Sequence, residues 1–151
     1  MSFYILLTAF FVRFFFIIIS DNNGSINLIE DELLYWENSL QYLKTGELSG
    51  EVLYERMPAI FIYYKVLLLL GLEKLQNVLL LQAFIDSISC LMIYKIANKI
   101  LYNYSIYIVT FAILSPLMII LSSQVLSETI FLFFFILFIY FSINAMYQNA
   151  M

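Results

Sequence analysis

The sequence predicts an all-α fold, a polytopic transmembrane bundle of four to five membrane helices, and two observations support this class. The 151 residues are 64% hydrophobic and only 12% charged, whereas a soluble globular domain is about half apolar and about a quarter charged. The apolar residues gather in blocks of about 15 to 20 between polar breaks, and a helix of about 20 residues crosses the roughly 30 Å of bilayer hydrocarbon. Residues 1–151 are therefore expected to form a single membrane domain.

Composition also excludes several classes of function. The net charge is −4 and the seven Lys and Arg residues are scattered without a basic patch, so a nucleic-acid partner is not expected. Histidine is absent and Cys90 is the only cysteine. Histidine-based catalysis, a zinc site and a disulfide within one chain are therefore excluded.

Five apolar blocks are read as membrane segments, in the order 3–20, 58–72, 78–94, 104–122 and 125–143. The first block lacks a basic start and a small-residue cleavage site, so it is expected to be retained rather than removed as a signal peptide. It contains Arg13, for which a snorkelling or bundle-facing charge is favoured over a substrate contact. In the third block Gln82, Asp86 and Ser89 share one helical face, where an interhelical contact is favoured over catalysis.

The first loop, residues 21–57, is long and strongly acidic. It holds eight acids and two bases, which gives it a net charge of −6 against −4 for the whole chain. Because cytoplasmic loops are enriched in Lys and Arg, this loop is expected on the extracytoplasmic face. Apolar residues recur in it at helical spacing and predict an interfacial amphipathic helix. These residues are Leu33, Trp36, Leu40 and Leu43, and Lys44 followed by Gly46 predicts the end of the helix.

The block 58–72 decides on which face the later loops lie. If it crossed the membrane, the loop with Lys95 and Lys99 would be extracytoplasmic, against the positive-inside bias, and Glu128 would be cytoplasmic. The block is short and contains Lys65. It is therefore expected to be re-entrant or interfacial, which returns Glu128 to the face of the acidic loop.

Carboxylates and an arginine of the acidic loop are candidate catalytic groups. An enzyme that acts on an anionic lipid-linked substrate needs a carboxylate to accept a proton from the attacking hydroxyl and a cation to hold the phosphate. Asp31 and Arg56 could supply these two groups. By composition alone, a merely solvated acidic loop is the commoner arrangement.

Short motifs follow one another along the chain in an informative order. They are Asp-Glu-Leu-Leu-Tyr at 31–35, Lys-Thr-Gly-Glu at 44–47, Tyr-Glu-Arg-Met-Pro at 54–58, Leu-Ser-Pro at 114–116 and Ser-Glu-Thr at 127–129. In this order and spacing the chain resembles, over nearly its whole length, the N-terminal module of the GT-C superfamily of membrane glycosyltransferases. The branch it resembles most contains protein mannosyltransferases and lipid A aminoarabinose transferases, which use polyprenyl-phosphate-linked sugars as donors.

The resemblance implies roles for five residues. Asp31 matches the first-loop acid that acts as the catalytic base on the acceptor hydroxyl, and Glu128 matches a second acid on the same extracytoplasmic face. Glu32 and Tyr35 match neighbours of the base at the substrate-binding site. Arg56 matches a Lys or Arg of relatives that holds the lipid phosphate. The residue after it is a methionine, where relatives have the first of two prolines.

The implied reaction is a hexosyl transfer with inversion from a polyprenyl-phosphate-sugar donor to a lipid, glycan or protein acceptor. Relatives differ in whether they need a divalent metal ion, and the sequence leaves that point open. The use of Ile, Asn, Lys, Tyr and Phe, which AT-rich codons encode, favours a bacterial inner membrane. Relatives are several times longer, so this chain is expected to be the N-terminal part of such a fold and inactive alone, since positioning supplies much of the rate.

Two other classes of function stay open on the sequence. The first is a small non-enzymatic integral membrane protein, such as a transporter subunit or an assembly factor, whose acidic loop binds a partner. The second, which is less favoured, is an ion or proton carrier that uses Asp86 and Glu128.

Overall fold

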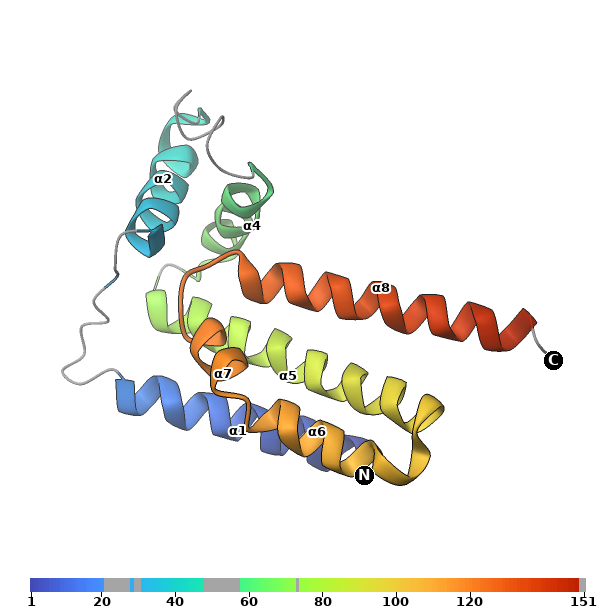
Figure 1. Ribbon diagram of the computed structural model, residues 1–151. Coiled ribbons are helices and arrows are strands. Elements are labelled where there is room, and N and C mark those ends of the chain that lie inside the picture. The colour runs from blue at the N-terminus through green and yellow to red at the C-terminus, as the bar shows by residue number, and fades with distance from the viewer. Residues whose placement is uncertain (21–27, 29–30, 48–57, 73, 150–151) are drawn as a thin grey trace.

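The computed structural model describes residues 1–20, 28, 31–47, 58–72 and 74–149, and every regular element in these residues is a helix (Figure 1). In chain order the elements are α1 (Ser2–Ser20), α2 (Asp31–Thr45), α4 (Pro58–Leu69), α5 (Leu75–Ile100), the short 3-10 helix η1 (Tyr102–Tyr104), α6 (Ser105–Ile113), α7 (Pro116–Ser122) and α8 (Glu128–Asn149). The predicted all-α fold class is confirmed.

Three of the described helices, α1, α5 and α8, are long and apolar enough to cross a membrane, and the bent pair of α6 and α7 is a fourth candidate. The described residues thus supply three to four spans, which is compatible with an integral membrane protein. The remaining predicted block, 58–72, forms α4, which has 12 residues. At 1.5 Å per residue it extends only about 18 Å, too short for roughly 30 Å of hydrocarbon.

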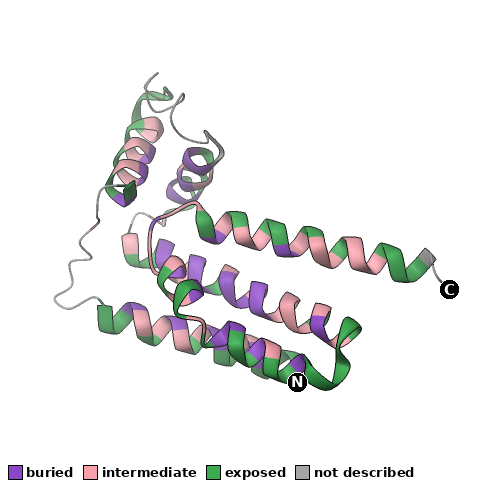
Figure 2. Ribbon diagram, viewed as in Figure 1, coloured by how far each residue is buried: buried purple, intermediate pink, exposed green. Residues whose placement is uncertain are grey.

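Helix α5 lies at the centre of the bundle, where it packs against α1, α6, α7 and α8. Figure 2 shows buried residues along much of α5, whereas α8 is mostly exposed or intermediate. Within the most apolar window of each helix, 44% of α5 is buried but only 11% of α8. The exposed side chains of α8 include Phe131, Phe134, Phe135, Phe138 and Phe141. Lipid tails are as apolar as these side chains, so such a face is suited to a bilayer.

An ion pair is buried inside the bundle. Arg13 of α1 is fully buried, and its Nε donates to the carboxylate of Asp86 in α5. Its Nη1 donates to the backbone carbonyls of Ala9 at 3.1 Å and Ile113 at 3.2 Å, and its Nη2 donates to Cys90 Sγ at 3.2 Å. The favoured interpretations, a bundle-facing Arg13 and an interhelical contact for Asp86, are confirmed.

Helices α6 and α7 meet at a bend of 50°. The sequence predicted a membrane segment over 104–122, and the structure forms it as two helices because Pro116 occupies the first turn of α7. Proline lacks a backbone N–H and disfavours helical geometry in the residue before it. Carbonyls at a helix end need other donors, and Arg13 of α1 provides one for the Ile113 carbonyl at the end of α6.

Helices α2 and α4 lie together beyond one end of the bundle, which we call the α2–α4 end. Helix α1 ends there, whereas α5 and α8 begin there (Figure 1). Helix α2 packs against α4, and the rings of Tyr35 and Phe61 lie 5.6 Å apart between them. Helix α4 therefore stays at the α2–α4 end, beside α2.

The helix expected within the acidic loop is present as α2. The structure buries Glu32, Tyr35 and Ser39, whereas Leu33 is 43% exposed. The reason is that α2 turns a polar and aromatic face towards the rest of the protein, where Glu32 finds a backbone partner. The interfacial position of α2 stays a prediction.

The helices α5 and α8 extend beyond the predicted blocks 78–94 and 125–143. Helix α5 runs on to Ile100, and α8 runs on to Asn149. The added turns contain polar residues such as Lys95 and Asn144, which hydropathy excludes from a span but which the helical backbone tolerates.

Candidate functional site

The connection between α7 and α8, residues 123–127, is where side chains from α2, α4 and α5 converge. Glu32 Oε1 in α2 accepts a hydrogen bond from the Val125 backbone N–H at 2.9 Å. Both residues are buried, and 93 positions separate them in the sequence. One contact therefore fastens the start of α2 to the segment directly before α8.

The next residue of the connection, Leu126, is held from two other helices. The Tyr64 hydroxyl of α4 and Gln82 Nε2 of α5 each donate to its carbonyl at 3.3 Å. Gln82 Nε2 also lies 3.2 Å from the Tyr64 hydroxyl. A further hydrogen bond links the helices on either side of the connection: Thr129 Oγ1 in the first turn of α8 donates to the Leu121 carbonyl of α7 at 2.8 Å. Because buried polar groups strongly favour being paired, these contacts define one arrangement of the connection.

The two acids predicted to be catalytic, Asp31 and Glu128, lie at helix starts at this end. Asp31 is the first residue of α2 and Glu128 the first of α8, and both are exposed. Glu128 Oε2 accepts a hydrogen bond from Ser127 Oγ at 3.2 Å. A carboxylate in a first turn is stabilised by the unpaired amides and the helix dipole, so each acid has a structural role available besides a catalytic one.

Of the residues predicted to bind substrate, the two that the structure describes are buried, unlike the two predicted catalytic acids. Glu32 and Tyr35 are each only 6% exposed; Glu32 bonds to Val125, and Tyr35 packs on Phe61. Arg56 lies outside the described residues. The structure thus gives Glu32 and Tyr35 packing and positioning contacts, and their role in binding substrate stays a prediction.

A lysine that the sequence interpretation did not include in the site lies between α2 and α4. Lys65 Nζ of α4 lies 3.6 Å from the centre of the Tyr42 ring of α2, a cation–π contact. The sequence could have indicated a role for Lys65, since it is a lone charge in an otherwise apolar block. It is a described cation of the α2–α4 end that can face an anionic group.

Burial perturbs two phenols of α4. It raises the pKa of Tyr63 from the ordinary 10.0 to about 12. The pKa of Tyr64 is also raised well above 10.0, first by burial and then by nearby Tyr63, while the hydrogen bond with Gln82 opposes the rise. Both phenols are therefore protonated at neutral pH, and the Tyr64 hydroxyl donates a hydrogen bond to the Leu126 carbonyl. Among the described residues, the Tyr63 hydroxyl and Gln82 Oε1 are buried without a hydrogen-bond partner.

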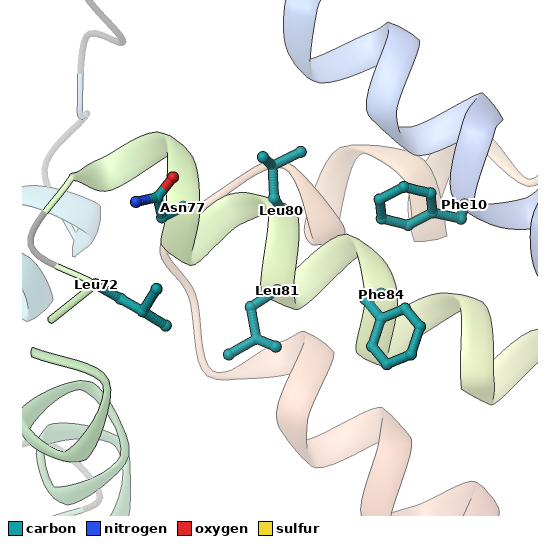
Figure 3. A pocket seen from close by; sticks show the side chains of 6 residues that line it. All are labelled: Phe10, Leu72, Asn77, Leu80, Leu81 and Phe84. Atoms are coloured by element: carbon teal, nitrogen blue, oxygen red, sulfur yellow. The ribbon is translucent and has the colours of Figure 1, made fainter. Parts of the chain in front are cut away.

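An open apolar groove of about 490 Å³ begins near this end, between α1, the turn after α4 and α5 (Figure 3). Its lining residues are Phe10, Leu72, Asn77, Leu80, Leu81 and Phe84. One lining residue, Asn77 in the first turn of α5, is polar; it lies beside Leu72, and the rest of the lining is apolar. An apolar groove of this kind suits a lipid chain.

The sequence left open whether the protein needs a metal ion. Within the described ranges no group of three or more His, Cys, Asp or Glu side chains is arranged to hold one.

No protein-family model, no curated protein and no solved structure matches this chain.

Proposed function

We propose that the chain is the N-terminal part of a GT-C-type glycosyltransferase, which moves a hexosyl group from a polyprenyl-phosphate donor to an extracytoplasmic acceptor in a bacterial inner membrane. The observation that carries the proposal is the hydrogen bond from the Val125 N–H to Glu32 at 2.9 Å. It joins the motif at 31–35 to the segment leading into the motif at 127–129. These are the two motifs whose acids the resemblance assigns to one active site.

In the proposed reaction Asp31 accepts the proton of the acceptor hydroxyl as its oxygen attacks the anomeric carbon. The bond from that carbon to the phosphate oxygen breaks, and the polyprenyl phosphate leaves with the electron pair, so the configuration inverts. A positioned general base contributes about 10²- to 10⁴-fold to the rate. The exposure of Asp31 at the start of α2 supports this role because an acceptor can reach it.

The leaving phosphate needs a cation and its lipid needs an apolar surface. Arg56 is the predicted cation. Among the described residues, Lys65 is a second cation that follows Arg56 in the sequence, and its ammonium group contacts α2 at Tyr42. The groove lined by Phe10, Leu81 and Phe84 supplies an apolar surface for an isoprenoid chain.

Charge supports the proposed orientation. The described acids of the α2–α4 end include Asp31, Glu37 and Glu128, whereas the charged side chains at the end of α5 are Lys95 and Lys99. Short loops rich in lysine favour the cytoplasmic face. The proposed active face is therefore extracytoplasmic.

The test combines a binding and a transfer measurement. The purified chain is exposed to a photoreactive polyprenyl phosphate. Because the N-terminal part is expected to be inactive alone, sugar transfer from a labelled polyprenyl-phosphate hexose is assayed with the chain in a functional full-length context. We expect Asp31→Asn to lower transfer at least 100-fold and to leave lipid capture unchanged. Glu37→Gln, another exposed carboxylate of α2, is the matched control and should transfer normally.

Two results would overturn the proposal. Normal transfer by Asp31→Asn would remove Asp31 as the base. A chain that neither captures polyprenyl phosphate nor supports transfer would favour the small non-enzymatic membrane protein instead.

A further inference from the structure

The end of the bundle opposite α2 and α4 carries a row of lysines facing a row of tyrosines. Lys95 and Lys99 are one turn apart in α5, and both are exposed. Lys95 Nζ lies 5.8 Å from the Tyr140 ring centre of α8, and Lys99 Nζ lies 4.7 Å from that of Tyr147. Lys99 Nζ also donates to Asn144 Oδ1 at 2.7 Å. We call these five residues the lysine seam between α5 and α8.

The seam keeps its positive charge. The contacts of Lys95 and Lys99 across it are with uncharged groups, namely two ring faces and an amide oxygen. The sequence has no Asp or Glu in residues 87–127 or 129–151, so no acidic side chain from these segments can neutralise the lysines. An ammonium group has three donors, and after the bond to Asn144 the Lys99 ammonium retains donors for another acceptor.

The length of α5 leads us to expect the seam at the depth of lipid headgroups. Helix α5 has 26 residues, about 39 Å at 1.5 Å per residue, which exceeds the roughly 30 Å of hydrocarbon. Both lysines lie in its last two turns, where the helix emerges into the interface. Exposed tyrosines, which favour membrane interfaces, surround this end of the bundle: Tyr4, Tyr102, Tyr104 and Tyr107. The anion abundant at this depth is lipid phosphate.

We propose that the lysine seam binds the phosphate of an anionic phospholipid headgroup. The two ammonium groups face the phosphate oxygens, and the tyrosine rings of α8 hold the lysine stems against the helix. The proposal does not depend on glycosyl transfer, because the seam and the α2–α4 end lie at opposite ends of the bundle (Figure 1). Near an anionic membrane surface each lysine strengthens binding about fivefold.

The test is a lipid titration of the purified full chain in neutral detergent, with bound lipid counted by native mass spectrometry. The probes are phosphatidylglycerol, phosphatidylcholine and inorganic phosphate. We expect phosphatidylglycerol to bind more tightly than phosphatidylcholine. Lys95→Gln and Lys99→Gln should each weaken this preference about fivefold, and together about 30-fold. Lys44→Gln, at an exposed lysine of α2, is the matched control and should behave like the unmodified chain.

The double variant Lys95→Arg with Lys99→Arg keeps both charges. It should retain the preference for phosphatidylglycerol, and it controls for the possibility that the glutamine variants fail to fold. The proposal is overturned if the glutamine pair still prefers phosphatidylglycerol, if Lys44→Gln loses the preference equally, or if the folded arginine pair loses it. Displacement of the lipid by millimolar inorganic phosphate would also overturn it, because the seam would then be a site for free phosphate.

Discussion

Replacing Arg13 with leucine should destabilise the helix bundle by about 3–5 kcal/mol, the usual cost of removing one partner of a buried ion pair. The side chain is fully buried, and its partner Asp86 is only 1% exposed. The substitution leaves the Asp86 carboxylate without its cation and removes the donor to the Ile113 carbonyl. A hydrogen bond between helices in a membrane is worth only about 0.6 kcal/mol, so the ion pair accounts for most of the expected loss.

The double variant Arg13→Leu with Asp86→Leu separates the ion pair from simple packing. Apolar replacement of both partners of a buried pair is often neutral, so the double variant should recover most of the stability that Arg13→Leu loses. The free energy of unfolding is measured in bicelles by steric trapping, and the four members of the cycle give the coupling energy. We expect a coupling of at least 2 kcal/mol, within the range for residues in direct contact.

Two outcomes would refute this reasoning. A cost below about 1 kcal/mol for Arg13→Leu would mean that the guanidinium does not compensate a buried carboxylate. Additive single and double variants would mean that Arg13 and Asp86 do not interact in the folded bundle.

Three further predictions follow from the α2–α4 end. Glu32→Ala should leave the buried Val125 N–H unpaired and cost about 1–3 kcal/mol, seen as faster amide exchange in α2; unchanged exchange would disprove the contact. Because the pKa of Tyr63 is raised to about 12 from 10.0, the unfolded chain loses this proton first, and stability should fall as pH rises from 10 towards 12; Tyr63→Phe should abolish that part of the loss. Phe84→Trp should fill the groove and weaken capture of polyprenyl phosphate about tenfold, one decade being about 1.4 kcal/mol, whereas Phe138→Trp on the exposed face of α8 should not.

The membrane helices could be predicted from the sequence because their signal is local. A long run of apolar residues is compatible with little else than a span, so α1, α5 and α8 were expected with errors only at their ends. The break between α6 and α7 was missed although Pro116 was visible, because a hydropathy run averages over a single residue. Its effect depends on whether another helix satisfies the freed carbonyl, as Arg13 does for Ile113.

The contacts of the candidate site could not be predicted in the same way. The spacing of Leu33 and Trp36 predicted an apolar face of α2, but it gave no sign that Glu32 would bond to Val125, 93 positions away. Similarly, Asp86 was expected to contact another helix, but nothing local identified Arg13, which is 73 positions away. Periodicity shows which residues share a face, whereas the partner of that face depends on the arrangement of all the helices.

The polar face of α5 links the bundle to the candidate site. Gln82 and Asp86 are one turn apart, so they lie on the same side of the helix. Asp86 fixes α1 through Arg13, while Gln82 fixes the connection before α8 through the Leu126 carbonyl. Because lipid provides no hydrophobic force that favours one helix register over another, such polar contacts select the register. The position of Glu128 relative to α2 is thus set by these polar contacts together with the buried apolar cluster at the α2–α4 end, which includes Tyr35, Phe61 and Val125.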